Sequence, residues 1–250
     1  MKRFVIIAVA ALSVLAAGCS SKKATSKPAA DRIAQTAARK VKTINSGHTR
    51  LVIKTISTGK VTTGLIAGKF HLGPTMMKVT VGNGGKLVDH YYFDKNEMYM
   101  KSENTWYKGK VDEKSELVKQ IKRQLTGSAN AQVLTNLKQD LKLKENDKTD
   151  TLSFKGVNPV GVKAAKQVIL SEAGRQAQKT LKDVRITHFE YRYTLDKKTF
   201  LPTKTFISMK YRNTRTKKAV TEKVTGTFTD INHVQKFGVP ASVRQNIQNF

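Results

Sequence analysis

The feature that most constrains the fold is a run of six short strand-like segments between His48 and Lys108. Tight turns separate them, among them Gly82-Asn-Gly-Gly85 and Asp94-Lys-Asn-Glu97. Short sequential strands joined in this way indicate an antiparallel meander, because parallel neighbours need long crossover connections. We predict strands at 51–56, 61–72, 76–81, 87–93, 98–101 and 105–108.

Helical periodicity flanks and interrupts the strands. Apolar residues recur every three or four positions, and strands return after Val184, with helices predicted at 31–44, 117–125, 133–141 and 162–181. The order of helix, strands, helices and strands predicts an α+β fold with one antiparallel sheet rather than βαβ units. A sheet of nine or more strands curls strongly. We therefore predict a half-barrel whose concave face is covered by the N-terminal helix and the central helices.

The N-terminus has the pattern of an export signal. Lys2 and Arg3 precede an apolar run that ends at Ala17, and at about 14 residues the run is shorter than the ~20 that span a bilayer. Leu15-Ala-Ala-Gly-Cys19 resembles the lipobox of bacterial lipoproteins, with Ala16 where leucine is usual. An uncleaved N-terminal anchor with an incidental cysteine is the alternative.

Cys19 is the only cysteine, so disulfides and cysteine-based metal sites are excluded within the chain. The lipobox resemblance implies that its thiol is lipid-modified, with palmitate among the acyl groups, and that Cys19 becomes the new N-terminus. We predict a signal peptide at 1–18, a flexible tether at 19–29 and one domain at 30–250. The expected location is the extracytoplasmic face of the cell membrane, held by acyl chains that contribute ~0.8 kcal/mol per buried methylene.

The chain is strongly basic. Its formal net charge is +28, and loss of Lys2 and Arg3 with the signal would leave +26. Such a charge suits nucleic acid, an anionic membrane surface or an acidic wall polymer. Because an exported protein rarely meets nucleic acid, we expect no nucleic-acid partner. A solvated basic surface and specific binding of wall polyanions or anionic headgroups both stay open.

No arrangement of residues points to catalysis. The histidines lack the spacing of a metal site and stand apart, at His48, His71, His90, His188 and His233. The sequence also contains no GxSxG and no P-loop. We predict a non-enzymatic protein with no catalytic residues, no cofactor and no metal.

Three segments resemble the LolA/LppX/LprG-like lipoprotein superfamily. They are Tyr92-Phe-Asp-Lys-Asn-Glu-Met-Tyr-Met-Lys101 followed by Trp106-Tyr-Lys108, Leu195-Asp-Lys-Lys-Thr-Phe-Leu-Pro202, and Phe228-Thr-Asp-Ile-Asn232 followed by Val239-Pro240. Their order behind a lipobox is that of the superfamily, and the chain is most similar to its unassigned, secreted Gram-positive branch. The resemblance implies a half-open curved sheet with helices on its concave side, often around an apolar cavity, and relatives that carry lipids or lipoproteins.

We predict this cavity beneath the helix at 162–181. Its expected lining is Ala165, Ile169, Ala173, Ala177, Tyr99 and Trp106. Small residues either pack closely on a sheet or leave room for an acyl chain, and the dense aromatic group at 91–107 suits either a ligand wall or an ordinary sheet core. The predicted function is a lipid-anchored lipoprotein that binds a hydrophobic or amphipathic ligand. The alternative is a basic envelope protein with a filled core that binds wall polyanions or anionic headgroups.

Overall fold

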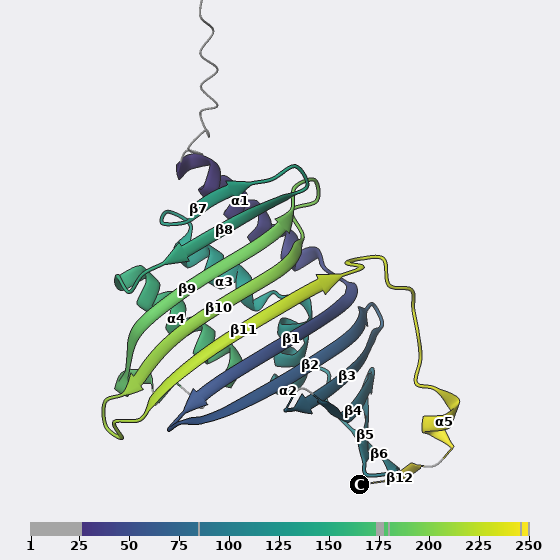
Figure 1. Ribbon diagram of the computed structural model, residues 1–250. Helices are drawn as coiled ribbons and strands as arrows, with labels where there is room; N and C mark the ends of the chain where they lie inside the picture. The colour runs from purple at the N-terminus through teal and green to yellow at the C-terminus, as the bar shows by residue number, and fades with distance from the viewer. Residues whose placement is uncertain (1–26, 85, 174–177, 180, 246, 250) are drawn as a thin grey trace, which may run out of the picture.

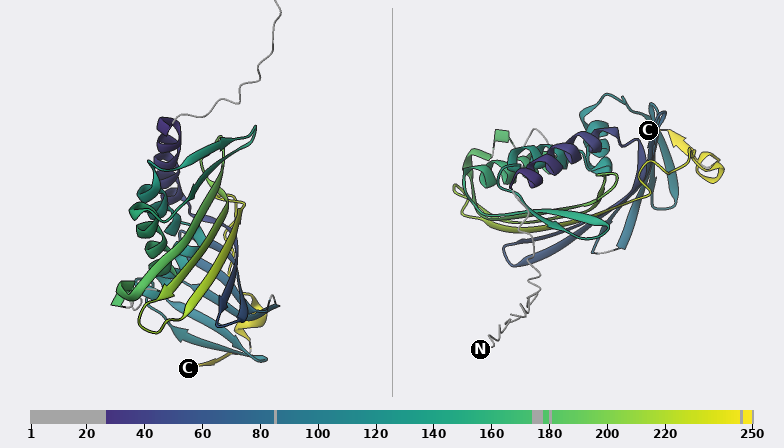
Figure 2. Two further views of the ribbon diagram at one scale, coloured as in Figure 1. Left: turned by 60° about the vertical axis from the view of Figure 1, so that its left-hand side comes forward. Right: turned by 90° about the horizontal axis from the view of Figure 1, so that it is seen from above.

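The computed structural model describes residues 27–84, 86–173, 178–179, 181–245 and 247–249. A sheet of twelve strands forms a curved wall, and the longer helices all lie on one side of it (Figure 1). Seen from above, the sheet curves around these helices (Figure 2). The predicted α+β fold, with a strongly curved sheet whose concave face is covered by helices, is therefore confirmed.

The elements follow the predicted order. The strands are β1 (Ser46–Ser57), β2 (Lys60–Leu72), β3 (Thr75–Asn83), β4 (Lys86–Asp94), β5 (Glu97–Ser102), β6 (Thr105–Lys110), β7 (Lys142–Glu145), β8 (Thr149–Lys155), β9 (Val184–Asp196), β10 (Pro202–Asn213), β11 (Ala219–Thr229) and β12 (Ile247–Asn249). The helices are α1 (Lys27–Lys40), α2 (Glu116–Thr126), α3 (Ala129–Leu137), α4 (Pro159–Ala173) and α5 (Ala241–Arg244), with short 3₁₀ turns η1 (Val41–Thr43) and η3 (Leu181–Asp183).

The sheet consists of two meanders that meet in its middle. The strand order is β12-β6-β5-β4-β3-β2-β1-β11-β10-β9-β8-β7. At the junction β1 pairs antiparallel with β11, from His48 opposite Thr229 to Ser57 opposite Val220. Pairing is antiparallel elsewhere too, except that β12 lies parallel to β6 at one edge. The two halves of the chain thus share one continuous wall.

Local chemistry explains where the central helices begin and end. The Ser115 side chain accepts a hydrogen bond from the Val118 amide and caps α2. The helix stops at Gly127, whose φ of 70° is a left-handed conformation that glycine adopts easily. The predicted separation of the helices at 117–125 and 133–141 is confirmed, with the break at Thr126-Gly127-Ser128. For α4, the Asn158 side chain accepts from the Gly161 amide, and Pro159 stands in the first turn, where a missing N–H costs nothing.

Several boundaries differ from those predicted. The first helix begins at Lys27 and so takes in residues 27–29 of the predicted tether. The helix predicted at 162–181 starts at Pro159, and its described part ends at Ala173. Strands β7 and β12 were not predicted, because each is only three or four residues long and carries no clear alternation. In the described residues no helix is both long and apolar enough to cross a membrane.

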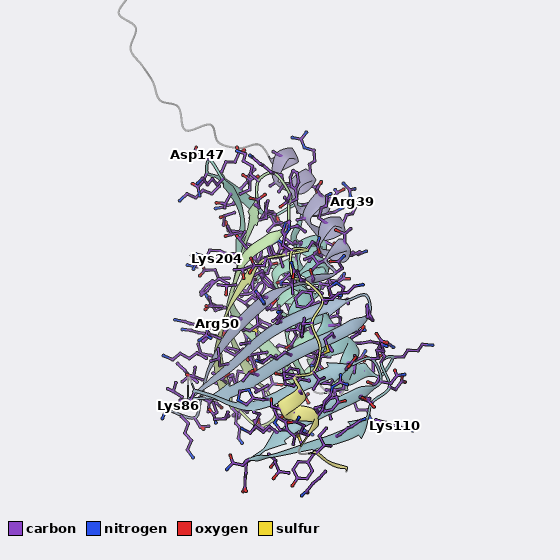
Figure 3. All side chains as sticks on the ribbon, turned by 90° about the vertical axis from the view of Figure 1, so that its right-hand side faces the viewer. Arg39, Arg50, Lys86, Lys110, Asp147 and Lys204 are labelled. Atoms are coloured by element: carbon purple, nitrogen blue, oxygen red, sulfur yellow. The ribbon has the colours of Figure 1, made fainter. Side chains whose placement is uncertain are left out.

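Buried side chains form three groups, which divide the molecule. The packed half is the concave side of β8–β11 under α1, α3 and α4, where Phe189, Tyr191 and Tyr193 are fully buried. The open half is the concave side of β2–β5 under η1 and α2. The outer cluster lies on the opposite face, where the C-terminal segment covers Tyr92 and Tyr99 of β4 and β5. Elsewhere that outward face carries basic side chains such as Arg50 and Lys204 (Figure 3).

Candidate functional site

An apolar groove runs between α2 and the sheet in the open half. Its volume is about 340 Å³. The sheet contributes Ile66, Val79, Val81, Tyr91, Phe93 and Met98, and α2 contributes Leu117, Ile121, Gln124 and Leu125. Val79 and Phe93 of the sheet and Leu125 of α2 are its buried lining residues, whereas Leu117 of α2 is 54% exposed. An apolar side chain left this accessible beside a concave apolar surface indicates a site that another molecule can fill.

A close contact holds the C-terminal end of α2 against the sheet. Leu125 lies over Gly68 of β2, where a Cβ atom added to the glycine would overlap with Leu125 Cδ2. The Thr49 hydroxyl of β1 donates a hydrogen bond to the Leu125 carbonyl at the same point. Because Gly68 has no side chain, the helix approaches β2 closely here. Leu125 also lines the groove, which extends from this contact toward β3–β5.

A polar cluster ties the other part of α2 to β3. Lys122 Nζ donates to Glu113 Oε1 at 2.7 Å and to the Thr75 hydroxyl at 3.0 Å, and Thr75 in turn bonds Glu113. The hydrogen bond from Lys122, followed by that from Thr75, lowers the pKa of Glu113. The carboxylate is therefore ionised at neutral pH. This cluster fixes the position of α2 without placing a charge inside the groove.

The groove itself has little reactive chemistry. Gln124 supplies the amide among its lining residues, and Tyr91 supplies a phenol. Burial, together with the nearby Asp89 carboxylate, raises the pKa of Tyr91, so this phenol stays neutral. A wall of aliphatic and aromatic side chains with one or two neutral polar groups suits an apolar ligand that needs orientation rather than activation.

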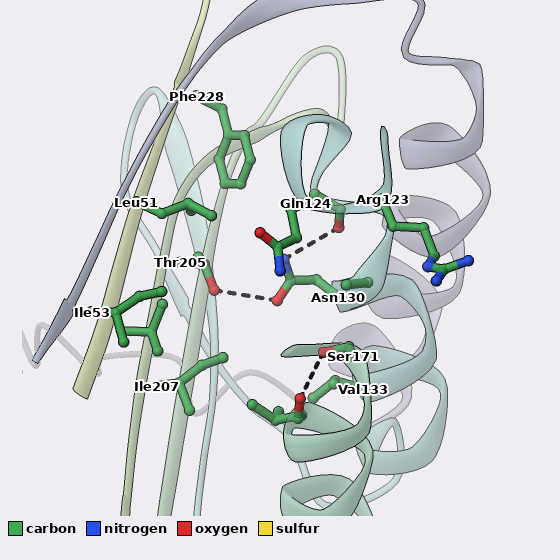
Figure 4. A pocket seen from close by; sticks show the side chains of 14 residues that line it. Leu51, Ile53, Arg123, Gln124, Asn130, Val133, Ser171, Thr205, Ile207 and Phe228 are labelled. Atoms are coloured by element: carbon green, nitrogen blue, oxygen red, sulfur yellow. Dashed lines mark hydrogen bonds between the residues drawn. The ribbon is translucent and has the colours of Figure 1, made fainter. Parts of the chain in front are cut away.

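A second, smaller cavity lies between the sheet and the helices α2, α3 and α4. Its volume is about 60 Å³, and Ser171 of α4 lies on one side of it and Ile207 of β10 on the other (Figure 4). Asn130 of α3 stands beside it, accepts hydrogen bonds from Tyr191 and Thr205, and donates one to the Gly127 carbonyl. Such a volume holds about two water molecules. It is too small for an acyl chain.

The structure separates the residues that were predicted to line one cavity. Ala165 is fully buried in the packed half, and Ile169 packs against the same core. Tyr99 and Trp106 belong to the outer cluster, on the far face of the sheet, where Trp106 lies 5.6 Å from Tyr92 between ring centroids. None of these four residues lines the groove. Ala164 and Ala165 are fully buried in the packed half, and the larger space lies under α2.

Other predicted positions lie at the end of the described part of α4 or outside the described residues. Ala173 is the last residue of α4, and Cys19 and Ala177 lie outside the described residues. Among the residues that are described, no group of three or more histidine, cysteine, aspartate or glutamate side chains is arranged to hold a metal ion. His48 instead pairs with Asp230 at 2.9 Å on the surface.

Sequence reasoning missed most of the groove. The stripe of Leu117, Ile121 and Leu125 is visible as helical periodicity, but periodicity does not distinguish a groove residue from a core residue. Strand alternation was the other available signal. It places Tyr91 and Phe93 on one face and Tyr92 on the other, and only the first two line the groove.

Fold and groove together define a class of open, curved-sheet proteins whose helices cover one face and leave an apolar groove. Within this class the chain belongs to the Family of unknown function (DUF6612), whose model matches residues 29–248. No curated protein matches the sequence at a significant level.

Solved structures that match the chain include the lipoprotein LppX and a second mycobacterial protein, LprF. LppX of Mycobacterium tuberculosis is 11% identical over 85% of this chain and 100% of its own, with a TM-score of 0.45. LprF of Mycobacterium bovis is 10% identical over 86% of this chain and 98% of its own, with a TM-score of 0.47. A LolA superfamily protein of Nitrosomonas europaea is 9% identical over 86% and 96%, with a TM-score of 0.30.

Proposed function

We propose that the protein is a non-enzymatic, lipid-anchored extracytoplasmic lipoprotein that binds one hydrophobic or amphipathic molecule, such as a lipid, in the groove under α2. The observation that carries this proposal is the groove of about 340 Å³, in which nine of the ten lining residues are aliphatic, aromatic or methionine. Ligand pockets of about 300–1,000 Å³ are typical of small-molecule sites. This volume suits a single acyl chain or a similarly slender molecule.

The shape of the groove supports binding without a large rearrangement. Ile121 and Leu117 of α2 face Val81 and Met98 of the sheet across it, and Leu117 is already exposed. An apolar ligand that covers such surface gains about 25 cal/mol per Å² removed from water. Binding therefore supplies apolar contacts that the sheet lacks beside α2.

The chemistry of the groove supports carriage rather than catalysis. Tyr91 is the one lining side chain that can titrate, and its raised pKa keeps it neutral. The Lys122–Glu113 pair lies outside the lining and is engaged with Thr75. A general acid or base must reach the reacting atom and hold a suitable pKa. The groove provides neither.

The anchor follows from the lipobox sequence. Cys19 stands eight residues before Lys27, where α1 begins. A lipidated Cys19 would hold the domain close to the membrane surface from which an amphipathic ligand could be taken. Replacement of Cys19 by Ala should release a folded domain into the soluble fraction. A Cys19→Ala protein that stays membrane-bound and uncleaved would contradict the anchor but leave the groove untouched.

Filling the groove tests ligand binding directly. Val81→Phe adds a ring on the β3 wall, and we expect a fluorescent fatty-acid analogue to bind at least tenfold more weakly, because the ring occupies its place. Val61→Phe is the matched control, since Val61 is 56% exposed and outside the groove. Native mass spectrometry of gently purified protein should show a bound apolar molecule in the wild type and in the control. Equal binding by both variants, or none by the wild type, would refute the proposal.

A further inference from the structure

The outward face of the sheet carries a concentration of cations. Alternation turns the residues of one parity in β1, β9, β10 and β11 away from the helices, and Figure 3 shows Arg50 and Lys204 on the side opposite Arg39 of α1. The outward cations of these strands and of β7 include Arg50, Lys54, Lys144, Arg192, Lys204 and Lys223. All six are exposed. We call them the outer basic face.

Carboxylates hardly neutralise this face. Of the sixteen outward positions 188–194 in β9, 204–210 in β10, 221–227 in β11 and 50–56 in β1, taken alternately, Glu190 alone is acidic. Glu190 is already bonded to Arg192 at 3.2 Å. Among the described residues, Arg50, Lys54, Lys144, Lys204 and Lys223 form no ion pair. The positive charge is therefore available to an external partner.

Two lysines on this face oppose each other directly. Lys54 of β1 lies across from Lys223 of β11 in the ladder. Like charges directly opposite each other in a sheet are destabilising. A strand pair that needed only stability would place a threonine or a carboxylate at one of the two positions. An anion between the two ammonium groups would instead turn this repulsion into attraction.

A regular row of cations and hydroxyls crosses the face. The strand registers place Lys144, Thr151, Thr194, Lys204, Thr227 and Arg50 side by side on successive strands. At about 4.8 Å per strand, Lys204 stands roughly 14 Å from Lys144 and roughly 10 Å from Arg50 along the row. Threonine hydroxyls fill the intervals. Cations at intervals with hydroxyl donors between them suit a chain of phosphate groups.

One end of the row forms a shallow hollow of about 420 Å³. Lys144, Arg192 and Lys204 line it together with the hydroxyls of Thr151 and Thr194. The Arg192 guanidinium lies 4.2 Å from the centroid of the Phe206 ring, which orients it over the sheet. An arginine held in this way loses little freedom when it binds an anion.

We propose that the outer basic face binds a linear polymer that carries repeating phosphate groups, along the row from Lys144 to Arg50. This role is independent of the groove, because the row lies on the other face of the sheet from α2. The shape of the face favours the polymer over a bilayer. The face is convex (Figure 2), so a flat membrane would meet only part of it, whereas a flexible chain can follow the row.

Apolar side chains give a second reason for this choice. Surfaces that dock on bilayers commonly insert exposed aliphatic or aromatic residues among their cations. The large exposed apolar residues of the described chain are Ile56, Val61, Val88, Leu117 and Val157, and none belongs to the row. Phe206, beside the row, lies beneath Arg192. Ile56 and Val61 lie on this face, opposite each other between β1 and β2, but at the other end of β1 from Arg50. The row itself thus offers charge and hydroxyls.

The test measures binding of end-labelled linear inorganic polyphosphate to the full-length protein in non-ionic detergent. Affinity should fall at least tenfold between 50 and 200 mM salt. The reason is that binding releases counterions from the polyphosphate, as it does when proteins bind nucleic acids. The variant with Arg50→Gln, Lys144→Gln and Lys204→Gln should bind at least tenfold more weakly and with a shallower salt dependence. The matched control removes three exposed cations from the helix side, through Arg39→Gln, Lys40→Gln and Lys163→Gln, and should stay within threefold of the wild type.

Three outcomes would overturn the proposal. Equal losses in the two triple variants would show that net charge alone drives binding. Unchanged affinity in the variant with Arg50→Gln, Lys144→Gln and Lys204→Gln would place the polymer elsewhere. Binding to phosphatidylglycerol vesicles that requires the row, without binding to polyphosphate, would assign the face to membranes.

The opposed lysines provide a second readout. Lys54→Gln should raise the melting temperature of the free protein, because it removes the repulsion from Lys223, and should weaken polyphosphate binding severalfold. A residue that served only the fold would not affect stability and affinity in opposite directions. A Lys54→Gln protein with full affinity for polyphosphate would exclude this pair from the binding surface.

Discussion

The packed half and the open half of the concave side share one sheet, yet only one of them is filled. Three helices cover the packed half, and the cavity left there is about 60 Å³. In the open half α2 covers the sheet with the help of the short η1 turn, and a groove of about 340 Å³ remains. Strand alternation is similar in both halves. The difference shows that helical cover, rather than the sheet, decides where this fold keeps space for a ligand.

Small residues explain why the packed half closes. Ala34, Ala37, Ala164 and Ala165 are at most 1% exposed, and they let α1 and α4 approach their neighbours closely. In the open half the close approach is limited to one point, where Leu125 meets Gly68. Away from this point Lys122 bonds Thr75 of β3, while Leu117 and Ile121 line the open groove. The groove is thus a consequence of where the small residues are placed.

The largest expected effect contrasts one aliphatic truncation in each half. Leu134→Ala removes a fully buried side chain of the packed half and should lower the free energy of unfolding by about 2–5 kcal/mol, since it leaves an enclosed cavity. Ile121→Ala enlarges a groove that is already open and should cost less, within about 1.5 kcal/mol. Urea denaturation measures both. Equal losses would mean that the two halves are equally well packed.

The next effect tests the point where α2 meets the sheet. Gly68→Ala places a methyl group against Leu125, which is only 1% exposed, and should lower stability by about 1–3 kcal/mol as α2 is pushed outward. Gly64→Ala lies in the same strand, but its new methyl group would be 3.9 Å from the nearest atoms. Thermal unfolding of the two variants should therefore differ clearly. Similar melting temperatures would show that α2 does not depend on this contact.

The smallest effect concerns the ion pair that secures α2. Because the folded-state pKa of Glu113 is lowered, its stabilising contribution is complete above its ordinary pKa near 4.5 and is lost as pH falls through the lower folded value. Both partners are partly exposed, so Glu113→Gln should cost at most about 1 kcal/mol at pH 7. The difference between wild type and variant should shrink below pH 4.5. A gap that persisted in acid would attribute the effect to packing instead.

Much of the architecture was predictable from local patterns. The turns at 82–85 and 94–97 and the break at Thr126-Gly127-Ser128 were read from glycine, asparagine and aspartate, whose backbone preferences act over a few residues. The order of helices and strands then implied an antiparallel sheet. The candidate site was harder to predict from local patterns. The helical stripe of α2 was recognised, but whether Leu117 and Ile121 meet another side chain depends on how far the sheet curls away from the helix.

The sequence by itself determined the elements, the order in which they follow one another and the basic character of the chain, because periodicity, turn chemistry and charge are properties of neighbouring residues. The tertiary structure alone decided that β1 pairs with β11, that β12 joins the edge at β6, and that the cations of five strands line up on one face. It also decided that the groove lies under α2 and not under α4. These features depend on contacts between distant segments and on how side-chain volumes fit together, which no local pattern encodes.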